Sequence, residues 1–556
     1  MPPRSRSPGV IEIVNPVAGL RPPEDRLARR LANVSGKRVA IVHSPLAFSR
    51  AFAERLGGLL RERYGVAEVV AVQRRHYIMP LTSQQIEALA SQASAVVLGV
   101  GENRPGTAIH AWDAVEMERR NVPTATLCTQ KAAILGKAGT TALGAPGLPV
   151  IALPDAATSG PQAAAEAVVD EVAQALTRPV EEIAARYRGL HASHDEVQEA
   201  LGLSSIARAE RLHVEATPEG VHQALADLRC WDGLPVVPPT PERVEAMVRS
   251  IARSPGDVVA YVPPRWGVAT PQKMAACAVM AGCRPEHLPV LTAAVQTLSV
   301  REMNALGVLT GTGPQAPLVL VHGPIRQETG INSGANALGP GVQANATIGR
   351  AMRLVLMAIG GSIPGLTDYA TLGQAGKYTL CLGENEEESP WQPLHADRGL
   401  DRNASAVTVI FLRGNFDVFT VSTRAEAILQ TIANGLKANS HGNVFYGGEL
   451  VVFLGPDFAK RLASAGYSKA DCQRYLFERA RVRVGDLPPE DIAALRAFRS
   501  DEFFDFSPDA LVPPARRPED ILLLVAGGHG IHITISPTAG GLSRSQTVPL
   551  EAQRPR

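Results

Sequence analysis

The residues best suited to chemistry lie in a glycine-rich stretch, residues 321–341, which follows an apolar run. The stretch holds five glycines and two prolines together with His322 and Arg326. Glycine lets backbone N–H groups approach a ligand closely, and the start of the following helical pattern favours an anion. We therefore predict a ligand loop. Its expected substrate-binding residues are Gly323, Asn332, Ser333 and Asn336.

His322 ends the apolar run and is the candidate for general acid/base work, since histidine titrates near neutral pH. The alternative is a core histidine whose ring bonds to a carbonyl. Arg326 and Lys377 are further catalytic candidates, and Arg265, which follows Val262-Pro-Pro, is a candidate for substrate binding. Converging Arg and Lys side chains would hold a carboxylate or phosphate. The alternative for each of them is a solvated surface charge.

The acidic run 384–388 could supply oxygen ligands for Mg²⁺ or Ca²⁺, but such runs are more often solvated faces. We expect one member of the run, Glu384 or Glu386, to point inward as a base or as an arginine partner, and Glu384 is the catalytic candidate. We predict no cofactor and no metal site, with a divalent metal as the less favoured alternative. The loop lacks both GxGxxG and the Lys-Ser/Thr of a phosphate-binding loop, so it does not predict nucleotide binding.

Two histidines lie near the end of another apolar run, in Gly-Gly-His-Gly-Ile-His. On a strand, positions three apart point to opposite faces, which argues against a shared metal ion. We expect His529 to lie at the rim of the site and to bind substrate, and His532 to be structural.

Residues 37–155 alternate apolar strand patterns with amphipathic helical ones. This alternation predicts a flavodoxin-like, doubly wound parallel sheet. Loop 101–107 lies between a strand and a helix, where open α/β sheets bind ligands, so Asn103 and Thr107 are further candidates for substrate binding. The alternative is a turn shaped by Pro105 and Gly106, with Thr107 as a helix cap.

The expected domains follow changes in composition along the chain. We predict a disordered tail at 1–36, the parallel α/β domain at 37–190, a helical connector at 191–225, a larger C-terminal α/β region at 226–545 with room for two subdomains, and a tail at 546–556. Apolar runs in the C-terminal region end in glycine-rich turns. This recurrence suggests strands that all end at one rim.

Composition excludes several classes of function. The 556 residues carry a formal net charge of +1, so there is no electrostatic reason to expect nucleic acid or an acidic membrane as a partner. The six cysteines are scattered without a CxxC pair, as in a reducing cytoplasm. No apolar run approaches a membrane span. We expect a cytoplasmic homo-oligomer that binds a small-molecule substrate.

The N-terminal loop and its surroundings resemble the UGSC family, named for a selenocysteine-Gly-Ser-Cys redox motif. The resemblance rests on Gly99-Val-Gly-Glu, Thr107, Asp113-Ala-Val-Glu and Val122-Pro-Thr, and it continues through Val262-Pro-Pro-Arg-Trp-Gly and His322-Gly-Pro-Ile-Arg. The family implies thiol redox chemistry. Here its two redox positions are occupied by Asn103 and Gly106, and neither residue can act as a thiolate. Asn103 and Thr107 would instead bind substrate through neutral hydrogen bonds.

These observations favour an enzyme that acts on a small polar, anionic metabolite by acid/base or addition–elimination chemistry. Its cleft would lie in the C-terminal region, and its reaction would be of lyase or transferase type rather than redox. One alternative is a thiol-dependent oxidoreductase whose chemistry has moved to Cys128, Cys230 or Cys381. Another is a non-catalytic binding or scaffold subunit.

Overall fold

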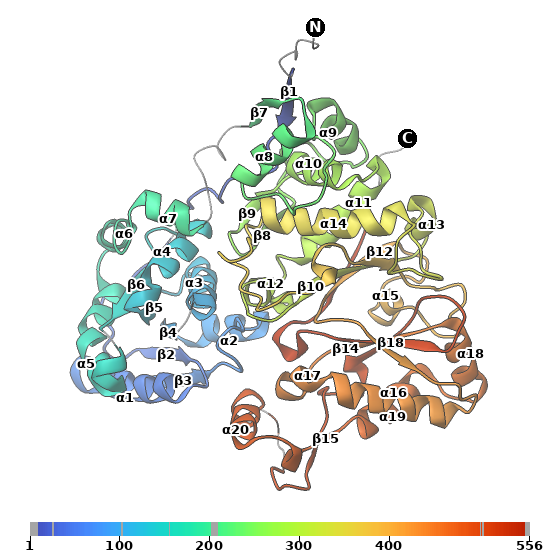
Figure 1. Cartoon of the computed structure of the whole chain (residues 1–556). Coiled ribbons are helices and arrows are strands. Elements are labelled where there is room, and N and C mark those ends of the chain that lie inside the picture. The colour runs from blue at the N-terminus through green and yellow to red at the C-terminus, as the bar shows by residue number, and fades with distance from the viewer. Residues whose placement is uncertain are drawn as a thin grey trace.

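The computed structural model describes residues 9–24, 27–101, 104–154, 156–201, 210–500, 502 and 505–550. The chain is a mixed α/β protein (Figure 1). An N-terminal domain, residues 38–200, holds a parallel sheet. A C-terminal domain consists of residues 9–18 together with residues 211–550. Within the described ranges, no helix is long and apolar enough to cross a membrane.

The N-terminal domain is built on a five-stranded parallel sheet of order β3-β2-β4-β5-β6. This is the flavodoxin-like strand order, and it confirms the predicted fold class. Helices cover both faces because alternate strand residues point to opposite sides. Ile41 and Val97 pack on α1 and α5, whereas Val42 and Leu98 pack on α2, α3 and α4. The bounds are β2 Arg38–His43, α1 Ala47–Tyr64, β3 Glu68–Gln73, α2 Ser83–Gln92, β4 Ala95–Gly101, α3 Arg104–Arg119, β5 Thr124–Thr129, α4 Ala133–Ala142, β6 Val150–Leu153, α5 Ala156–Thr177, α6 Val180–Arg188 and α7 His194–Ala200.

The predicted N-terminal tail is wrong for the residues around β1 (Val10–Val14). This strand pairs antiparallel with β7 (Arg211–Glu215), and its Ile13 and Val14 are buried in the core of the C-terminal domain. Figure 1 shows β1 in dark blue beside the green elements at the top of the molecule. β1 was missed because its partner lies far away in the sequence, where a local pattern gives no signal. Residues 1–8 lie outside the described part.

Two further predicted segments, 191–225 and 546–556, also differ from the structure. The segment 191–225 contains the strand β7 and most of α8 (Pro218–Asp227), so it is only partly helical. The predicted tail at 546–556 begins in a strand, because β19 (Gln546–Pro549) pairs antiparallel with β12. Both strands are short and depend on a distant partner.

The C-terminal domain has four layers, with two mixed sheets packed face to face between helices (Figure 1). The first sheet has the order β11-β10-β12-β19 and the second β13-β18-β14-β17. Leu318, Leu320 and Ile410 of the first sheet pack against Val451 and Leu524 of the second. Helices α10, α11 and α14 cover the outer face of the first sheet, and α16, α18 and α19 cover that of the second.

The elements of these layers have the following bounds: α10 Pro271–Ala281, α11 Leu288–Thr297, β10 Ala316–His322, α14 Gln343–Ala358, β11 Cys381–Gly383, β12 Ala406–Leu412, β13 Phe416–Phe419, α16 Ala425–Asn439, β14 Leu450–Leu454, α18 Pro456–Ser464, α19 Lys469–Arg479, β17 Ile521–Val525 and β18 His532–Pro537. Smaller elements connect them: α9 Pro241–Val248, β8 Ala260–Val262, β9 Gly267–Ala269, α12 Ala305–Leu309, α13 Ile325–Thr329, α15 Leu394–Asp397, α17 His441–Tyr446, β15 Val482–Arg483, α20 Pro489–Phe498 and β16 Leu511–Val512.

A buried charge cluster joins the two domains. Asp113, on α3, forms ion pairs with Arg74 of the N-terminal domain and with Arg301 of the C-terminal domain, the latter at 2.5 Å. Asp113 is fully buried, and the Arg301 guanidinium lies over the ring of Trp112 at 4.4 Å. Trp112 in turn lies 4.7 Å from Trp266 of the C-terminal domain, centroid to centroid. Charge and aromatic packing therefore hold the domains together.

Candidate functional site: a buried histidine and carboxylate cluster

The side chain of His322 lies between the two sheets of the C-terminal domain. His322 is the last residue of β10, two positions after Leu320, so it shares the face that meets the second sheet. Glu384 follows β11 directly and shares the face of Leu382. Thr408 lies on the same face of β12, opposite Leu320. The strand register thus brings polar side chains together at one end of an otherwise apolar layer.

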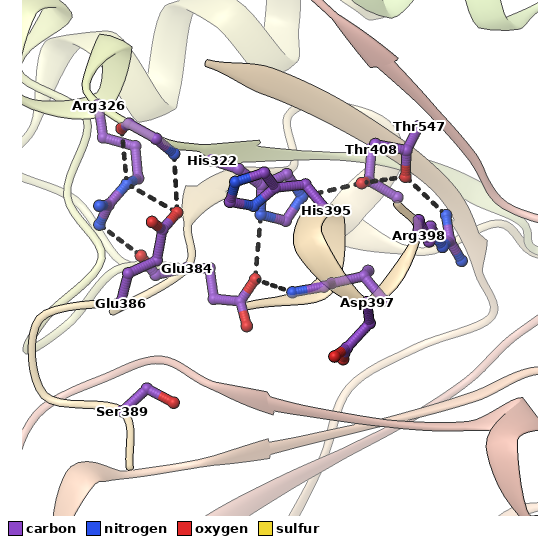
Figure 2. A network of polar contacts seen from close by, with 12 residues as sticks. His322, Arg326, Glu384, Glu386, Ser389, His395, Asp397, Arg398, Thr408 and Thr547 are labelled. Carbon is purple, nitrogen blue, oxygen red and sulfur yellow. Dashed lines mark hydrogen bonds and ion pairs between the residues drawn. The ribbon is translucent and has the colours of Figure 1, made fainter. Parts of the chain in front are cut away.

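A chain of polar contacts leads away from the ring of His322 (Figure 2). Its Nε2 lies 2.8 Å from Thr408 Oγ1, and Thr408 Oγ1 lies 2.7 Å from Thr547 Oγ1. Arg398 donates to Thr547 Oγ1 at 2.7 Å and pairs with Glu449 at 3.2 Å. Because a guanidinium can only donate, Thr547 accepts from it, which leaves the hydroxyl hydrogen of Thr547 available to Thr408. This series of polar contacts fixes the orientation of the His322 imidazole.

The other ring nitrogen of His322 faces Glu384. Nδ1 lies 3.0 Å from Glu384 Oε2, which also accepts a hydrogen bond from the Leu394 N–H at 3.0 Å. Both side chains are fully buried. Burial lowers the pKa of His322 below its ordinary value, and Glu384 offsets this only in part. Burial raises the pKa of Glu384, but His322, Lys469 and the Leu394 N–H outweigh burial, so that this pKa is lowered. A neutral imidazole therefore lies beside an ionised carboxylate at neutral pH.

His395 and Glu386 complete the cluster. His395 is fully buried on α15, its ring centroid is 5.1 Å from that of His322, and its Nε2 lies 3.1 Å from the carbonyl oxygen of Arg402. Glu386 Oε1 accepts a hydrogen bond from the Gly323 N–H at 2.7 Å. One ligand-type atom each from His322, Glu386 and His395 lies within 4.8 Å of the others, a set that could hold a metal ion. The acidic run alone did not indicate a metal site, and the structure adds two histidines to it.

Arg326 belongs to the cluster, but its donors are occupied. Nε donates to the Gly323 carbonyl at 3.0 Å, and Nη1 to the Glu384 carbonyl at 2.5 Å. Nη1 and Nη2 also bind Glu387 at 3.0 and 2.8 Å. The side chain is buried, so it clamps the acidic run against the start of the loop. Gly323 must be glycine here, because its φ is +76° and a Cβ would lie 2.3 Å from the Ala404 oxygen.

The structure places Lys377 and Arg265 away from this cluster. Lys377 pairs with Asp368 at 2.7 Å beside a separate cavity of about 310 Å³, lined also by Trp231, Arg353 and Tyr378. Arg265 is buried and donates to the carbonyl oxygens of Ala18, Ala358 and Ile359, and burial lowers its pKa to about 10. Its prediction as a substrate anchor is wrong, because its turn folds inward onto the end of α14.

The polar residues of the predicted ligand loop mainly shape the loop itself. Asn332 accepts from the Gly334 N–H and donates to the Ala335 carbonyl, and Asn336, at a φ of +60°, donates to the Pro340 carbonyl. The Ser333 carbonyl accepts from the Gly527 N–H at 2.8 Å. This bond joins the loop after β10 to the loop after β17, so strand ends from both sheets meet here, as the sequence predicted.

The remaining predicted residues are dispersed. His529 is exposed at the rim, with Nδ1 2.9 Å from Asp457 and Nε2 3.3 Å from Glu388; the hydrogen bond that its ring donates to Asp457 raises its pKa. Thr107 is fully buried within α3, in the other domain. Asn103 lies outside the described residues. Sequence reasoning missed His395, Arg398, Thr408 and Thr547. Thr408 alone gave a signal, as a polar residue in the apolar run 406–412.

All six cysteines lie in the described part of the chain, and none forms a disulfide. Cys128, Cys230 and Cys381 are buried, and burial raises the pKa of all three, to about 12 for Cys128 and Cys230. Reactive cysteines have lowered pKa values and partial exposure, so these positions do not favour thiolate chemistry.

Residues 12–182 match the model of the UGSC family, which confirms the resemblance for this part of the chain. The matched residues end before the cluster. No curated protein matches the chain. A similar solved structure is the sugar isomerase domain of an RpiR transcription factor from Sphaerobacter thermophilus. It is 21% identical and covers 30% of this chain and 78% of that chain, with a TM-score of 0.17. That score is too low to support any statement about function.

Proposed function

We propose that the protein is an enzyme whose catalytic centre is the cluster of His322, Glu384, Glu386 and His395. The observation that carries this proposal is a neutral imidazole held between an ionised carboxylate and a hydroxyl chain. A base oriented by a second group is the recurring arrangement of acid/base catalysis. His322 would accept or donate the proton, and Glu384 and Thr408 would position its ring.

The substrate we propose is a small polar metabolite. Arg265, Arg326 and Lys377 were the reason to expect an anion, yet each is engaged by carbonyl or carboxylate groups. The rim nearest to the cluster carries Glu386, Glu387 and Glu388. An anion would therefore need a further positive charge at this site.

The reaction we propose is of lyase or transferase type. Acid/base chemistry uses the groups present in the cluster, whereas an oxidoreductase with relocated thiols would need an accessible thiolate. Burial raises the pKa of Cys128 and Cys230 to about 12 and so disfavours the thiolate form.

Untargeted metabolite profiling tests the proposal and requires no choice of substrate in advance. The full chain and the His322→Asn variant would each be incubated with a small-molecule extract and analysed by mass spectrometry. We expect the native protein to deplete one compound and to form another, and the variant to lose this conversion. Conversion that persists in His322→Asn would refute the assignment, and no conversion by the native protein would favour the binding-subunit alternative.

Two controls separate chemistry from folding and from thiols. His532→Gln removes a histidine whose side chain is 65% exposed and which pairs with Asp417, where β13 and β18 of the second sheet meet. This variant should leave conversion unchanged. Alkylation of the native protein should also leave conversion intact, because five of the six cysteines are buried. Loss of activity on alkylation, in protein that remains folded, would restore the thiol hypothesis.

A further inference from the structure

We propose that His322, His395 and Glu386 bind a divalent first-row transition-metal ion, with Glu384 as the neighbouring carboxylate. This inference rests on the proposed function and names a cofactor for the same site; with the ion on Nδ1 of His322, the proton transfer falls to the neighbouring carboxylate of Glu384. Nothing in the amino-acid sequence joins His395 to the other residues. The register of β10 and β11 and the position of α15 bring them together (Figure 2).

The two imidazoles present buried Nδ1 atoms at this cluster: that of His395 has no hydrogen-bond partner among the described residues, and that of His322 faces Glu384. The carbonyl of Arg402 can only accept, so the hydrogen of His395 is on Nε2 and Nδ1 holds a lone pair. This Nδ1 is buried and has no hydrogen-bond partner among the described residues. Nδ1 of His322 is equally buried. It lies 3.0 Å from Glu384 Oε2, which is its partner while the ring carries a proton there, and a metal ion would take the place of that proton.

A hydrogen bond on the ring nitrogen that does not bind the ion is typical of histidines that ligate metal. Such histidines donate the second ring N–H to a carbonyl, a carboxylate or a similar acceptor, which fixes the tautomer. The Arg402 carbonyl serves His395 in this way, and the Thr408 hydroxyl is placed to serve His322. A buried polar atom without a partner costs about 1–3 kcal/mol, and Nδ1 of His395 is such an atom among the described residues.

The charges of the cluster also favour a cation. Glu384, Glu386 and Glu387 bring three carboxylates together, and Arg326 is the cation that pairs with Glu386 and Glu387. The charge of Lys469 also lowers the pKa of Glu384, but the ion pair of Lys469 is with Asp397, at 2.5 Å. Buried carboxylates are stable when paired or bound to metal, and a divalent ion would balance the two remaining charges.

Distances and donor types define the class of metal. Metal–nitrogen and metal–oxygen bonds of about 2 Å place two ligand atoms no more than about 4 Å apart. The three atoms lie within 4.8 Å, so a small movement of Glu386, whose side chain is 12% exposed, would close the site. Imidazole nitrogen with carboxylate oxygen suits ions such as Zn²⁺, Co²⁺ or Fe²⁺, whereas Mg²⁺ and Ca²⁺ prefer oxygen ligands throughout.

Binding of Zn²⁺ and Co²⁺ to the full chain tests the inference directly. Protein stripped with a chelator and dialysed would be titrated in a calorimeter, and bound metal counted by mass spectrometry. We expect one ion per chain, an absorption spectrum of Co²⁺ bound to nitrogen, and loss of more than about 100-fold in affinity for His395→Ala, beyond the loss typical of supporting residues. Absence of a stoichiometric ion, or equal affinity in His395→Ala, would overturn the inference.

A matched pair of glutamate variants guards against misfolding and non-specific charge effects. Glu386→Gln keeps an oxygen to accept the Gly323 N–H but loses the charged ligand. Glu388→Gln makes the same change at a side chain bound by Asn385 and Lys460. We expect weaker binding in Glu386→Gln and none of this effect in Glu388→Gln, with thermal melts confirming that both fold. Equal losses would mean that general acidity attracts the ion and would overturn the assigned site.

The two proposals can fail separately. An ion bound by His322, His395 and Glu386 without any conversion of metabolites would refute the enzyme and leave the metal site. Conversion that depends on His322, in protein that takes up no stoichiometric ion, would refute the metal site and leave the enzyme.

Discussion

Replacement of Asp113 by alanine should destabilise the protein far more than the same replacement of Glu116, one turn along α3. Both carboxylates are contacted by two arginines. Asp113 and Arg74 are fully buried, and Arg301 is 9% exposed. Glu116 pairs with Arg119 and Arg120, and these three side chains are 23–32% exposed. The two variants therefore differ mainly in how deeply the removed carboxylate is buried.

The magnitudes follow from solvation. Removing one partner of a buried ion pair leaves uncompensated charge and costs about 3–5 kcal/mol. Breaking a pair that water can reach costs about 0–1 kcal/mol. Asp113→Ala would also remove the acceptor near the Leu81 N–H, at 3.3 Å. We expect the free energy of unfolding to fall by about 3 kcal/mol more in Asp113→Ala than in Glu116→Ala.

Urea unfolding followed by tryptophan fluorescence is a suitable assay, because Trp112 lies under Arg301 and against Trp266 at the domain boundary. Asp113→Asn, which keeps an acceptor for Leu81, should lie between the native protein and Asp113→Ala. Free energies for Asp113→Ala and Glu116→Ala that agree within about 1 kcal/mol would show that burial does not set the strength of this junction.

Two further predictions concern pH and the loop clamp. Burial lowers the pKa of His76 to about 3, so protonation favours the unfolded chain, and stability present above pH 6.5 is lost as the pH falls towards 3. At pH 5 the loss should be about 2 kcal/mol. His76→Asn, which can still accept from the Ile78 N–H, should flatten this dependence in unfolding experiments at pH 5 and 7.5; an unaltered slope would assign it to other groups. Arg326→Ala should lower the free energy of unfolding by about 1–3 kcal/mol, since its charged hydrogen bonds hold the acidic run, and an unchanged thermal melt would disprove the clamp.

The parallel domain could be predicted from the sequence because its signals are local. Each strand and helix shows its own period, and right-handed crossovers then restrict the topology. The strand β1 could not be found in this way, since five apolar or alternating residues near a terminus gain their meaning only from β7. The same limit applies to β19 and β12.

The candidate site was predicted in part for a similar reason. His322 was identified because it ends an apolar run that reads as a strand, and Glu384 because it begins the acidic run 384–388. Arg265 looked like a ligand residue because it stands in a proline turn, but the direction of that turn depends on the end of α14. His395 lies in a short helix without a recognisable motif, so only three-dimensional proximity shows that it belongs beside His322.

The pairing of β1 with β7 imposes an order on folding during synthesis. β1 is synthesised before the parallel domain, and its partner strand β7 is made only after that domain. The parallel domain holds all five of its strands between the two and can fold in that interval. Joining β1 to β7 then closes the chain into a loop around a finished domain. Deleting residues 1–15 should therefore destabilise the C-terminal domain, which is the domain that contains His322.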